Sequence, residues 1–315
     1  MSDIYRNGMY GLIVGDALGV PVEFSSRQTR KIDPVTGMRA YGTYKQPAGT
    51  WSDDSSMALA TLDSIKEKSE LDYKDIMQRF FDWKTTGAYT PFNDTFDIGI
   101  ATANAISRFK AGGDPTKCGG TTEYDNGNGS LMRILPVCLY LYEKQKKVCT
   151  SEDESIYHIH AASALTHAHL RSQMACGIYY FCVKAIIEET GSINDRLQKG
   201  MDKAFSYYRR DLSNNSELDF YNRLSDVDSL SQTNENDIGS SGYVVASLEA
   251  AIWCLATTNT YSEAVLKAVN LGEDTDTVGA ITGALAGLYY GEEGIPEEWI
   301  EAIQRREFIE EILQK

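Results

Sequence analysis

Cysteine and histidine are sparse in this sequence and do not form a metal-binding or disulfide pattern. The 315 residues contain six cysteines and four histidines, and no CxxC pair occurs. The histidines share one stretch, 158–169, without a cysteine or carboxylate at ligand spacing, so a zinc site is not expected. The cysteines are at irregular positions, which is typical of free thiols in a reducing compartment. The Gly-x-Ser-x-Gly motif is also absent, which argues against a serine hydrolase.

Positive charge is also scarce. Thirty lysines and arginines oppose 45 aspartates and glutamates, which gives a formal net charge of −15. Such a surface repels nucleic acid and anionic membranes, so we expect no broad nucleic-acid surface. The longest notable apolar run, Val278–Tyr290, holds 13 residues, fewer than the roughly 20 needed to span a bilayer. No basic segment followed by an apolar core opens the chain, so we expect a cytoplasmic protein with no membrane contact.

Helical periodicity dominates the rest of the sequence. Apolar residues recur at spacings of three and four, as in the segment Tyr243–Thr257, whereas the alternation typical of half-buried strands is hard to find. The fold class predicted is therefore all-α. A polar stretch, 192–241, ends as an expected surface loop that leads into the 243–257 helix. No linker is evident, so residues 1–315 are predicted to form a single domain.

Two glycine series repeat every four residues. The first is Gly11, Gly15 and Gly19, and the second is Gly279, Gly283 and Gly287. A glycine inside a helix costs about 1 kcal/mol relative to alanine, so such series indicate a face that another backbone approaches closely. We therefore expect one helix near the N-terminus and one near residue 280 in the crowded middle of the fold.

Two acid-rich segments stand directly before helical patterns. They are Ser52-Asp53-Asp54 and Glu273-Asp274-Thr275-Asp276-Thr277. Each could simply cap its helix and complement the helix dipole. If the two helix starts meet, however, they supply two carboxylates and a hydroxyl each, and such hard oxygen donors suit Mg²⁺, Mn²⁺ or Ca²⁺ rather than Zn²⁺. The similarity of the two segments is compatible with one shared site, and sequence spacing alone leaves open whether they meet.

A glycine-rich segment, Tyr124–Arg133, offers a further candidate site. Backbone N–H groups in such a loop can bind oxyanions, although a plain turn before a helix is equally compatible with the pattern. Arg133 could supply positive charge or be tied to a carboxylate. Tyr124 and Tyr243 could stack on a base, although tyrosines are more often packing residues.

Six ordered blocks in this chain resemble the ADP-ribosylglycohydrolase superfamily. The blocks are Gly11-Leu-Ile-Val-Gly-Asp-Ala-Leu-Gly-Val-Pro-Val-Glu23, Thr50-Trp-Ser-Asp-Asp54, Gly127-Asn-Gly-Ser-Leu-Met-Arg133, Thr166-His167, Ser241-Gly-Tyr243 and Gly272-Glu-Asp-Thr-Asp-Thr277. The resemblance implies an all-α orthogonal bundle with a binuclear centre of two divalent cations, Mg²⁺ or Mn²⁺, between helix N-termini. It also implies the metal ligands Ser52, Asp53, Asp54, Asp274, Asp276 and Thr277. Serine at the first position replaces a common threonine and keeps the hydroxyl oxygen.

The resemblance also assigns residues to catalysis and substrate binding. Glu23 is implied to be a mobile acid beside the metals, although an isolated glutamate is more often a surface or capping residue. Asp97 resembles, over three residues only, a carboxylate at the reaction centre of the arginine-directed relatives. The implied ADP-ribose contacts are Gly127, Asn128, Gly129, Ser130, Met132, Arg133, His167, Ser241, Gly242 and Tyr243. Asp16, an acid among apolar residues, needs a buried partner and is expected to support the site.

The function implied is metal-dependent removal of ADP-ribose from a modified substrate by cleavage of a glycosidic bond. ADP-ribosylarginine in protein is the favoured substrate, while ADP-ribosylserine and O-acetyl-ADP-ribose remain alternatives. A phosphohydrolase acting on a nucleotide diphosphate and a non-catalytic ADP-ribose binder are rivals from other classes. Nothing in the sequence fixes the oligomeric state, and a monomer is slightly favoured.

Overall fold

The computed structural model of the protein describes residues 3–148 and 150–315. Within these ranges the regular structure is helical, and only three isolated bridges replace strands, which confirms the all-α class. The α-helices are α1 (Ile4–Gly19), α2 (Arg27–Ile32), α3 (Asp53–Lys68), α4 (Tyr73–Thr86), α5 (Ile100–Lys110), α6 (Leu135–Val148), α7 (Glu152–Ala164), α8 (Leu170–Glu188), α9 (Ile193–Tyr208), α10 (Asn215–Leu218), α11 (Val227–Ser231), α12 (Val244–Ala256), α13 (Tyr261–Val269), α14 (Thr275–Tyr290), α15 (Glu297–Ala302) and α16 (Arg306–Gln314).

Short 3₁₀ turns connect several of these helices. They are η1 (Val20–Val22), η2 (Gly42–Tyr44), η3 (Pro115–Lys117), η4 (Glu123–Asp125), η5 (Leu212–Asn214), η6 (Asp219–Ser225), η7 (Glu235–Asp237) and η8 (Glu292–Gly294). The end of the polar stretch is the predicted loop before α12, interrupted only by η7. Its earlier part folds into α9 and a series of short turns.

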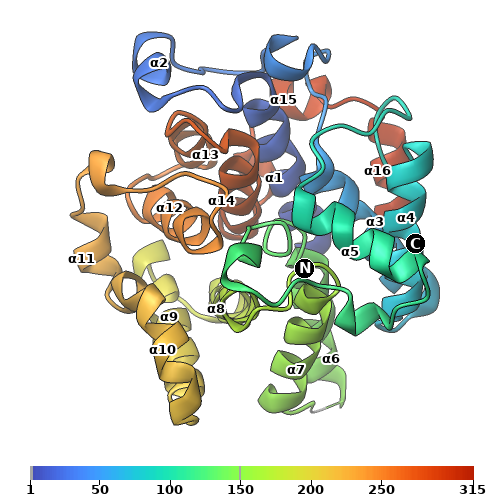
Figure 1. The fold of residues 1–315 in the computed structure, drawn as a ribbon. Helices are drawn as coiled ribbons and strands as arrows, with labels where there is room; N and C mark the ends of the chain where they lie inside the picture. The colour runs from blue at the N-terminus through green and yellow to red at the C-terminus, as the bar shows by residue number, and fades with distance from the viewer. Residues whose placement is uncertain (1–2, 149) are drawn as a thin grey trace.

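Helices α1 and α14 form a central pair, and Figure 1 shows them side by side in the middle of the molecule. A methyl group added to Gly15 would lie 2.1 Å from the carbonyl oxygen of Gly279, and one on Gly11 would lie 2.2 Å from that of Gly283. Both distances are far below van der Waals contact, so the two backbones touch where side chains are missing. The expected close packing of both glycine faces is confirmed, and each series is the partner of the other.

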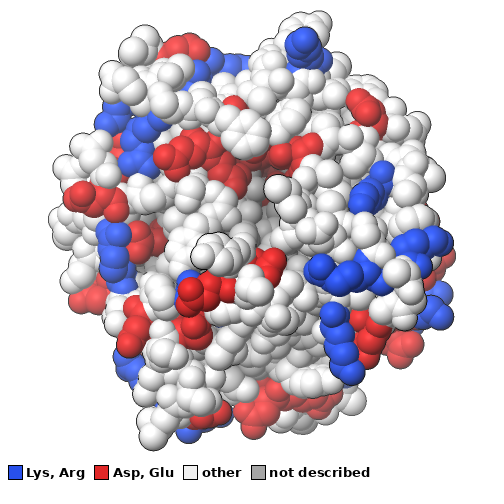
Figure 2. Space-filling model, viewed as in Figure 1, with Lys and Arg blue, Asp and Glu red and all other residues white. Residues whose placement is uncertain are grey.

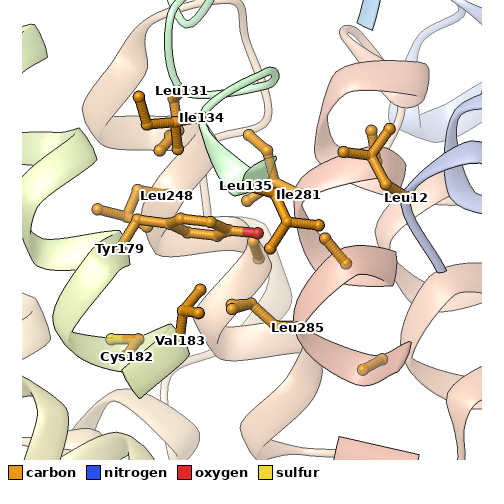
Figure 3. Packing of buried hydrophobic residues seen from close by; sticks show 14 of the residues in the cluster. Leu12, Leu131, Ile134, Leu135, Tyr179, Cys182, Val183, Leu248, Ile281 and Leu285 are labelled. Carbon is orange, nitrogen blue, oxygen red and sulfur yellow. The ribbon is translucent and has the colours of Figure 1, made fainter. Parts of the chain in front are cut away.

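The hydrophobic core surrounds this pair. One cluster of buried side chains draws on residues from Tyr5 to Leu313. Figure 3 shows part of it: the ring of Tyr179 on α8 extends toward Ile281 and Leu285 on α14, with Leu248 of α12 beside it. Helix α14 is therefore packed on several sides, and this packing fixes the position of its N-terminus.

Two further expectations concern the membrane and the cysteines. None of the helices formed by residues 3–148 and 150–315 combines the length and the apolar character needed to cross a bilayer. Five of the six cysteines are buried free thiols, namely Cys118, Cys138, Cys176, Cys182 and Cys254, and Cys149 lies outside the described residues. The single-domain organisation stays a prediction.

Candidate active site

The two acid-rich segments meet at the N-termini of α3 and α14. Ser52 caps α3 and accepts a hydrogen bond from the backbone N–H of Asp54, and Asp274 occupies the N-cap position of α14. The hydroxyl of Thr277 donates to Oδ2 of Asp54 at 3.2 Å across the two helices. The first segment therefore both caps its helix and contributes to the shared site, whereas the Asp274 side chain makes no capping hydrogen bond to the described part of α14.

Asp16 holds the start of α3 in place. Its carboxylate accepts hydrogen bonds from the backbone N–H groups of Ser52 and Ser55, and from the Ser55 hydroxyl at 2.5 Å. Burial raises the pKa of Asp16 to about 6, and these hydrogen bonds oppose the rise. The expectation that Asp16 has buried partners is confirmed, and the partners are the segment that carries the first acidic residues.

The glycine pair positions the second acid-rich segment. A methyl group on Gly19 would lie 2.3 Å from the backbone nitrogen of Asp276. The Thr275 hydroxyl donates to the carbonyl of Gly19 at 2.8 Å. The glycine face of α1 thus lets the first turn of α14, with its carboxylates, lie directly against the end of α1.

Glu23 joins the acidic cluster from the turn after α1. One carboxylate oxygen each from Glu23, Asp274 and Asp276 lies within 4.8 Å of the others, an arrangement that could hold a metal ion. Only 5% of Glu23 is exposed, so the surface alternative for this residue is wrong. The resemblance implied a mobile acid beside the metals at Glu23, and the geometry makes this residue a candidate metal ligand as well.

The electrostatics of the cluster favour a bound cation. Burial, reinforced by neighbouring carboxylates, raises the pKa of Glu23 to about 9 and holds those of Asp53, Asp54 and Asp276 well above their usual range. Buried oxygens of Glu23 (Oε2), Asp54 (Oδ1) and Asp276 (Oδ2) have no hydrogen-bond partner among the described residues. Buried carboxylates in this state need protons or cations. Because the donors are all oxygens, the residues fit Mg²⁺ or Mn²⁺.

Asp97 approaches the cluster from the segment before α5. It adopts a left-handed backbone conformation, with φ of 56°, and its Oδ1 accepts a hydrogen bond from the Tyr44 hydroxyl at 2.6 Å. Asp97 also contributes to raising the pKa of Glu23 and Asp53, so the three carboxylates share one electrostatic environment. The structure therefore brings Asp97 to the site that the three-residue match indicated.

A cavity of about 370 Å³ opens beside the cluster. Its lining comes from the turn after α1, the starts of α3, α5 and α14, the segment before α5, the 124–132 loop, Gly242 and His167. The predicted residues in the lining are Glu23, Asp53, Asp97, Gly127, Asn128, Gly129, Met132, His167, Gly242, Asp274 and Thr277. The cavity thus joins three of the predicted metal ligands to much of the predicted substrate loop, while Ser52, Asp54 and Asp276 are buried behind this lining.

The glycine loop is fastened to the start of α12 and to α14. The N–H of Asn128 donates to the carbonyl of Gly242 at 3.0 Å, and its side-chain amide donates to Oδ2 of Asp274 at 2.8 Å. Gly129 lies on the ring of His167, where an added methyl group would be 2.8 Å from Cε1. The absence of side chains at this point lets the loop backbone lie close to the ring and line the cavity.

Several predicted contact residues do not line the cavity. Ser130 is buried and hydrogen-bonded to Ser163, Arg133 is fully buried, and Ser241 is exposed. Tyr243 caps α12, and its hydroxyl accepts a hydrogen bond from Arg171 at 3.2 Å. Tyr124, in contrast, lines the cavity and is completely exposed.

The structure also adds residues that sequence reasoning missed. Tyr44 holds Asp97, Phe24 and Ile100 lie at the rim with 70% and 81% exposure, and Thr102 lies beneath Gly129. No motif marks these residues. The only signal was adjacency, because Phe24 follows Glu23, and Ile100 and Thr102 follow the Asp97-Ile-Gly block.

Comparison with known proteins gives one consistent family. The profile described as ADP-ribosylglycohydrolase matches residues 2–315. ADP-ribosylarginine hydrolase Tri1 of Serratia proteamaculans is 28% identical over 99% of this chain and 78% of the relative. ADP-ribosyl-[dinitrogen reductase] glycohydrolase of Rhodospirillum rubrum is 27% identical over 94% of this chain and 88% of the relative.

A solved structure agrees with the sequence relatives. The chain titled ADP-ribosylglycohydrolase-related protein complex superposes with a TM-score of 0.74 at 29% identity, covering 99% of this chain and 95% of that one. The arrangement of helices described above is therefore similar to that of a known member of this group.

Proposed function

The chain belongs to the ADP-ribosylglycohydrolase family and is an enzyme, and from this premise we propose that it releases ADP-ribose from ADP-ribosylarginine in modified proteins. The observation that carries the proposal is the cavity, which is lined both by carboxylates from four separated segments and by the glycine loop. The arginine linkage is supported by the printed activity of the Serratia relative, which is similar over nearly the whole of this chain.

The family is metal-dependent, and we assign Mg²⁺ or Mn²⁺ to the acidic cluster. Ser52, Asp53 and Asp54 on α3, and Asp274, Asp276 and Thr277 on α14, are the residues that would hold two divalent cations. Bound there, such cations neutralise the clustered carboxylates, orient the ribose and lower the pKa of a nearby water. The unpartnered oxygens of Asp54 and Asp276 support this assignment.

The chain's own carboxylates would serve the reacting centre. Cleavage at an anomeric carbon passes through an oxocarbenium-like state, which an anionic pocket stabilises. Asp97 is held by Tyr44 and lines the same cavity as Glu23. One of these carboxyl groups can therefore accept a proton from the attacking water, while the other donates one to the leaving nitrogen.

The glycine loop would bind the diphosphate. Among residues 3–148 and 150–315, the backbone N–H groups of Gly129 and Ser130 have no acceptor, whereas that of Asn128 is already bonded to Gly242. Neither lysine nor arginine from the described residues lines the cavity. Free backbone donors and bound cations would therefore supply the positive potential that the phosphates need.

A release assay tests the proposal. Purified protein would be incubated with arginine- and serine-ADP-ribosylated peptides and with O-acetyl-ADP-ribose, in Mg²⁺, Mn²⁺ or chelator, and the products read by mass spectrometry. We expect intact ADP-ribose from the arginine peptide, with metal only. Release from another linkage would overturn the arginine assignment. AMP instead of ADP-ribose would indicate a phosphohydrolase, and tight ADP-ribose binding without release from any substrate would indicate a binder.

A further inference from the structure

We infer that Arg133 and Thr166 are positioning residues that fix the tautomer of His167, so that its Nε2–H points into the cavity as a hydrogen-bond donor to ADP-ribose. The inference rests on the proposed function only for the identity of the ligand. It gives Arg133, which does not line the cavity, a role behind the histidine rather than on the substrate.

Arg133 is a buried cation whose hydrogen bonds all go to the end of α7 and the turn that follows it. Its Nη2 donates to the Thr166 hydroxyl oxygen at 2.7 Å and to the carbonyl of Ala162 at 3.1 Å. The guanidinium also stacks over the Phe80 ring at 4.9 Å from the centroid, while Nε and Nη1 have no partner among the described residues. A guanidinium carries donors only, so the direction of the bond to Thr166 is unambiguous.

Because the Thr166 hydroxyl oxygen accepts from Arg133, the hydroxyl is left to donate to the histidine. This oxygen accepts from Arg133 and lies 2.9 Å from Nδ1 of His167, and Thr166 is fully buried. In the part of the chain that the structure describes, the Thr166 hydroxyl hydrogen has no acceptor other than this Nδ1. If Nδ1 carried the proton instead, a buried hydroxyl hydrogen would be left unpaired, which is unfavourable.

An imidazole that accepts at Nδ1 carries its proton at Nε2 when it is neutral. The environment keeps the ring neutral: burial, together with the nearby Arg133 cation, lowers the pKa of His167 to about 3. The Asp125 carboxylate opposes this lowering, but it already accepts from the N–H and hydroxyl of Thr122. Burial and the Arg133 cation together keep the ring neutral, and Arg133 acts on the tautomer through the Thr166 hydroxyl.

The free nitrogen lies against the glycines that line the cavity. His167 lines the cavity, and Nε2 lies under Gly127, where an added methyl group would be 3.4 Å away. Within residues 3–148 and 150–315, no side chain or carbonyl accepts from Nε2. A donor here matches a phosphate or ribose oxygen, whereas the opposite tautomer would present a lone pair to them.

The tautomer is tested by ¹⁵N NMR of protein labelled at histidine, in Mg²⁺ and without ligand. We expect the His167 ring in the wild type to be neutral from pH 5 to 8, protonated at Nε2, with Nδ1 accepting a hydrogen bond. Thr166→Ser keeps the hydroxyl and should preserve this signature. Thr166→Val removes the hydroxyl at nearly constant volume but leaves the burial and Arg133 in place, so it should give a ring that stays neutral and populates both tautomers. A wild-type ring protonated at Nδ1, or an unchanged signature in Thr166→Val, would overturn the inference.

Calorimetry with ADP-ribose and Mg²⁺ tests the consequence for binding. Thr166→Val should weaken binding about tenfold, and raise KM by a similar factor with kcat changed less, whereas Thr166→Ser stays within about twofold of the wild type. Arg133→Met, if it folds, should change the NMR signature in the same direction. Equal affinity of Thr166→Val and wild type would overturn the donor role. Failure of the wild type to bind ADP-ribose would refute the proposal that ADP-ribose is the ligand. The tautomer of His167 is decided separately, by the spectra recorded without ligand.

Discussion

Asp276 shows how the site trades stability for binding. Its Oδ1 accepts a hydrogen bond from the backbone N–H of Thr277, and its Oδ2 has no partner among the described residues. The carboxylates of Glu23 and Asp274 lie close by. In the metal-free protein, Asp276→Asn removes a buried charge and adds an amide donor. We expect it to raise Tm by about 3 °C, the shift that roughly 1 kcal/mol produces. With Mg²⁺, hydrolysis should fall by more than about 100-fold, because even outer partners of a metal contribute 10–100-fold.

The control for this variant is Asp63→Asn. Asp63 is also buried, but its carboxylate is paired with Arg79 and Lys315. Removing this charge should therefore lower Tm and leave Mg²⁺-dependent hydrolysis intact. The gain from Asp276→Asn should be larger at neutral pH than near pH 4, where an ordinary aspartate begins to ionise. The Asp276 carboxyl has a raised pKa in the folded protein, so the folded state binds its proton more tightly than the unfolded state does. The free energy of unfolding therefore falls as pH rises from the ordinary carboxyl pKa toward the raised one. A lower Tm of Asp276→Asn than of the wild type in chelator, or undiminished hydrolysis by this variant in Mg²⁺, would contradict the assignment of Asp276 as a ligand.

At the scale of elements, the α1–α14 pair is the feature most sensitive to a single methyl group. Gly15→Ala would place Cβ 2.1 Å from the Gly279 oxygen, a backbone atom that no rotamer change can move. We expect a loss of about 3 kcal/mol or more of unfolding free energy, measured in urea, because the helices must separate. Gly37→Ala is the matched control, since its Cβ would lie 3.5 Å from Nε1 of Trp299 and should change stability by less than about 0.5 kcal/mol. Similar losses in both variants would show that the glycine contact is not special.

The same pair shows which parts of the fold can be predicted from sequence. A glycine every four residues reveals a bare helix face because the spacing is close to one helical turn. The acid-rich segments reveal themselves because capping and metal binding both require oxygen donors at a helix start. The resemblance to known hydrolases supplied the roles of Glu23 and Asp97, which no periodicity indicates.

Other features of the site depend on turns whose direction only tertiary packing decides. Phe24 and Asp97 adopt left-handed backbone conformations, and nothing in their local sequence requires this. The contact between Tyr44 and Asp97 joins two segments 53 residues apart. The resemblance implied a substrate contact for Arg133, but the turn that precedes α6 leaves this side chain fully buried over Phe80. A motif identifies neighbours in sequence, and the backbone decides which of them face the cavity.

At the scale of the whole molecule, charge and site are matched in sign. The net charge is −15, and Figure 2 shows acidic side chains gathered in the central part of the face viewed in Figure 1. The cavity lining itself includes the carboxylates of Glu23, Asp53, Asp97 and Asp274. An anionic ligand such as ADP-ribose therefore enters against the field of the protein and depends on cations and backbone donors at the site. A positively charged segment attached to it would instead be attracted.

This field predicts a preference for substrates with basic flanks. Two ADP-ribosylarginine peptides, identical except for lysines or glutamates on either side of the modified residue, would be compared at fixed Mg²⁺. At 10 mM ionic strength, kcat/KM should favour the lysine peptide by about tenfold, because the potential extends over a Debye length of about 30 Å. In 1 M salt the Debye length shrinks to about 3 Å, so the ratio should approach one. A ratio that does not respond to salt would mean that short-range contacts with the flanking residues, rather than the field of the whole molecule, decide which peptide is preferred.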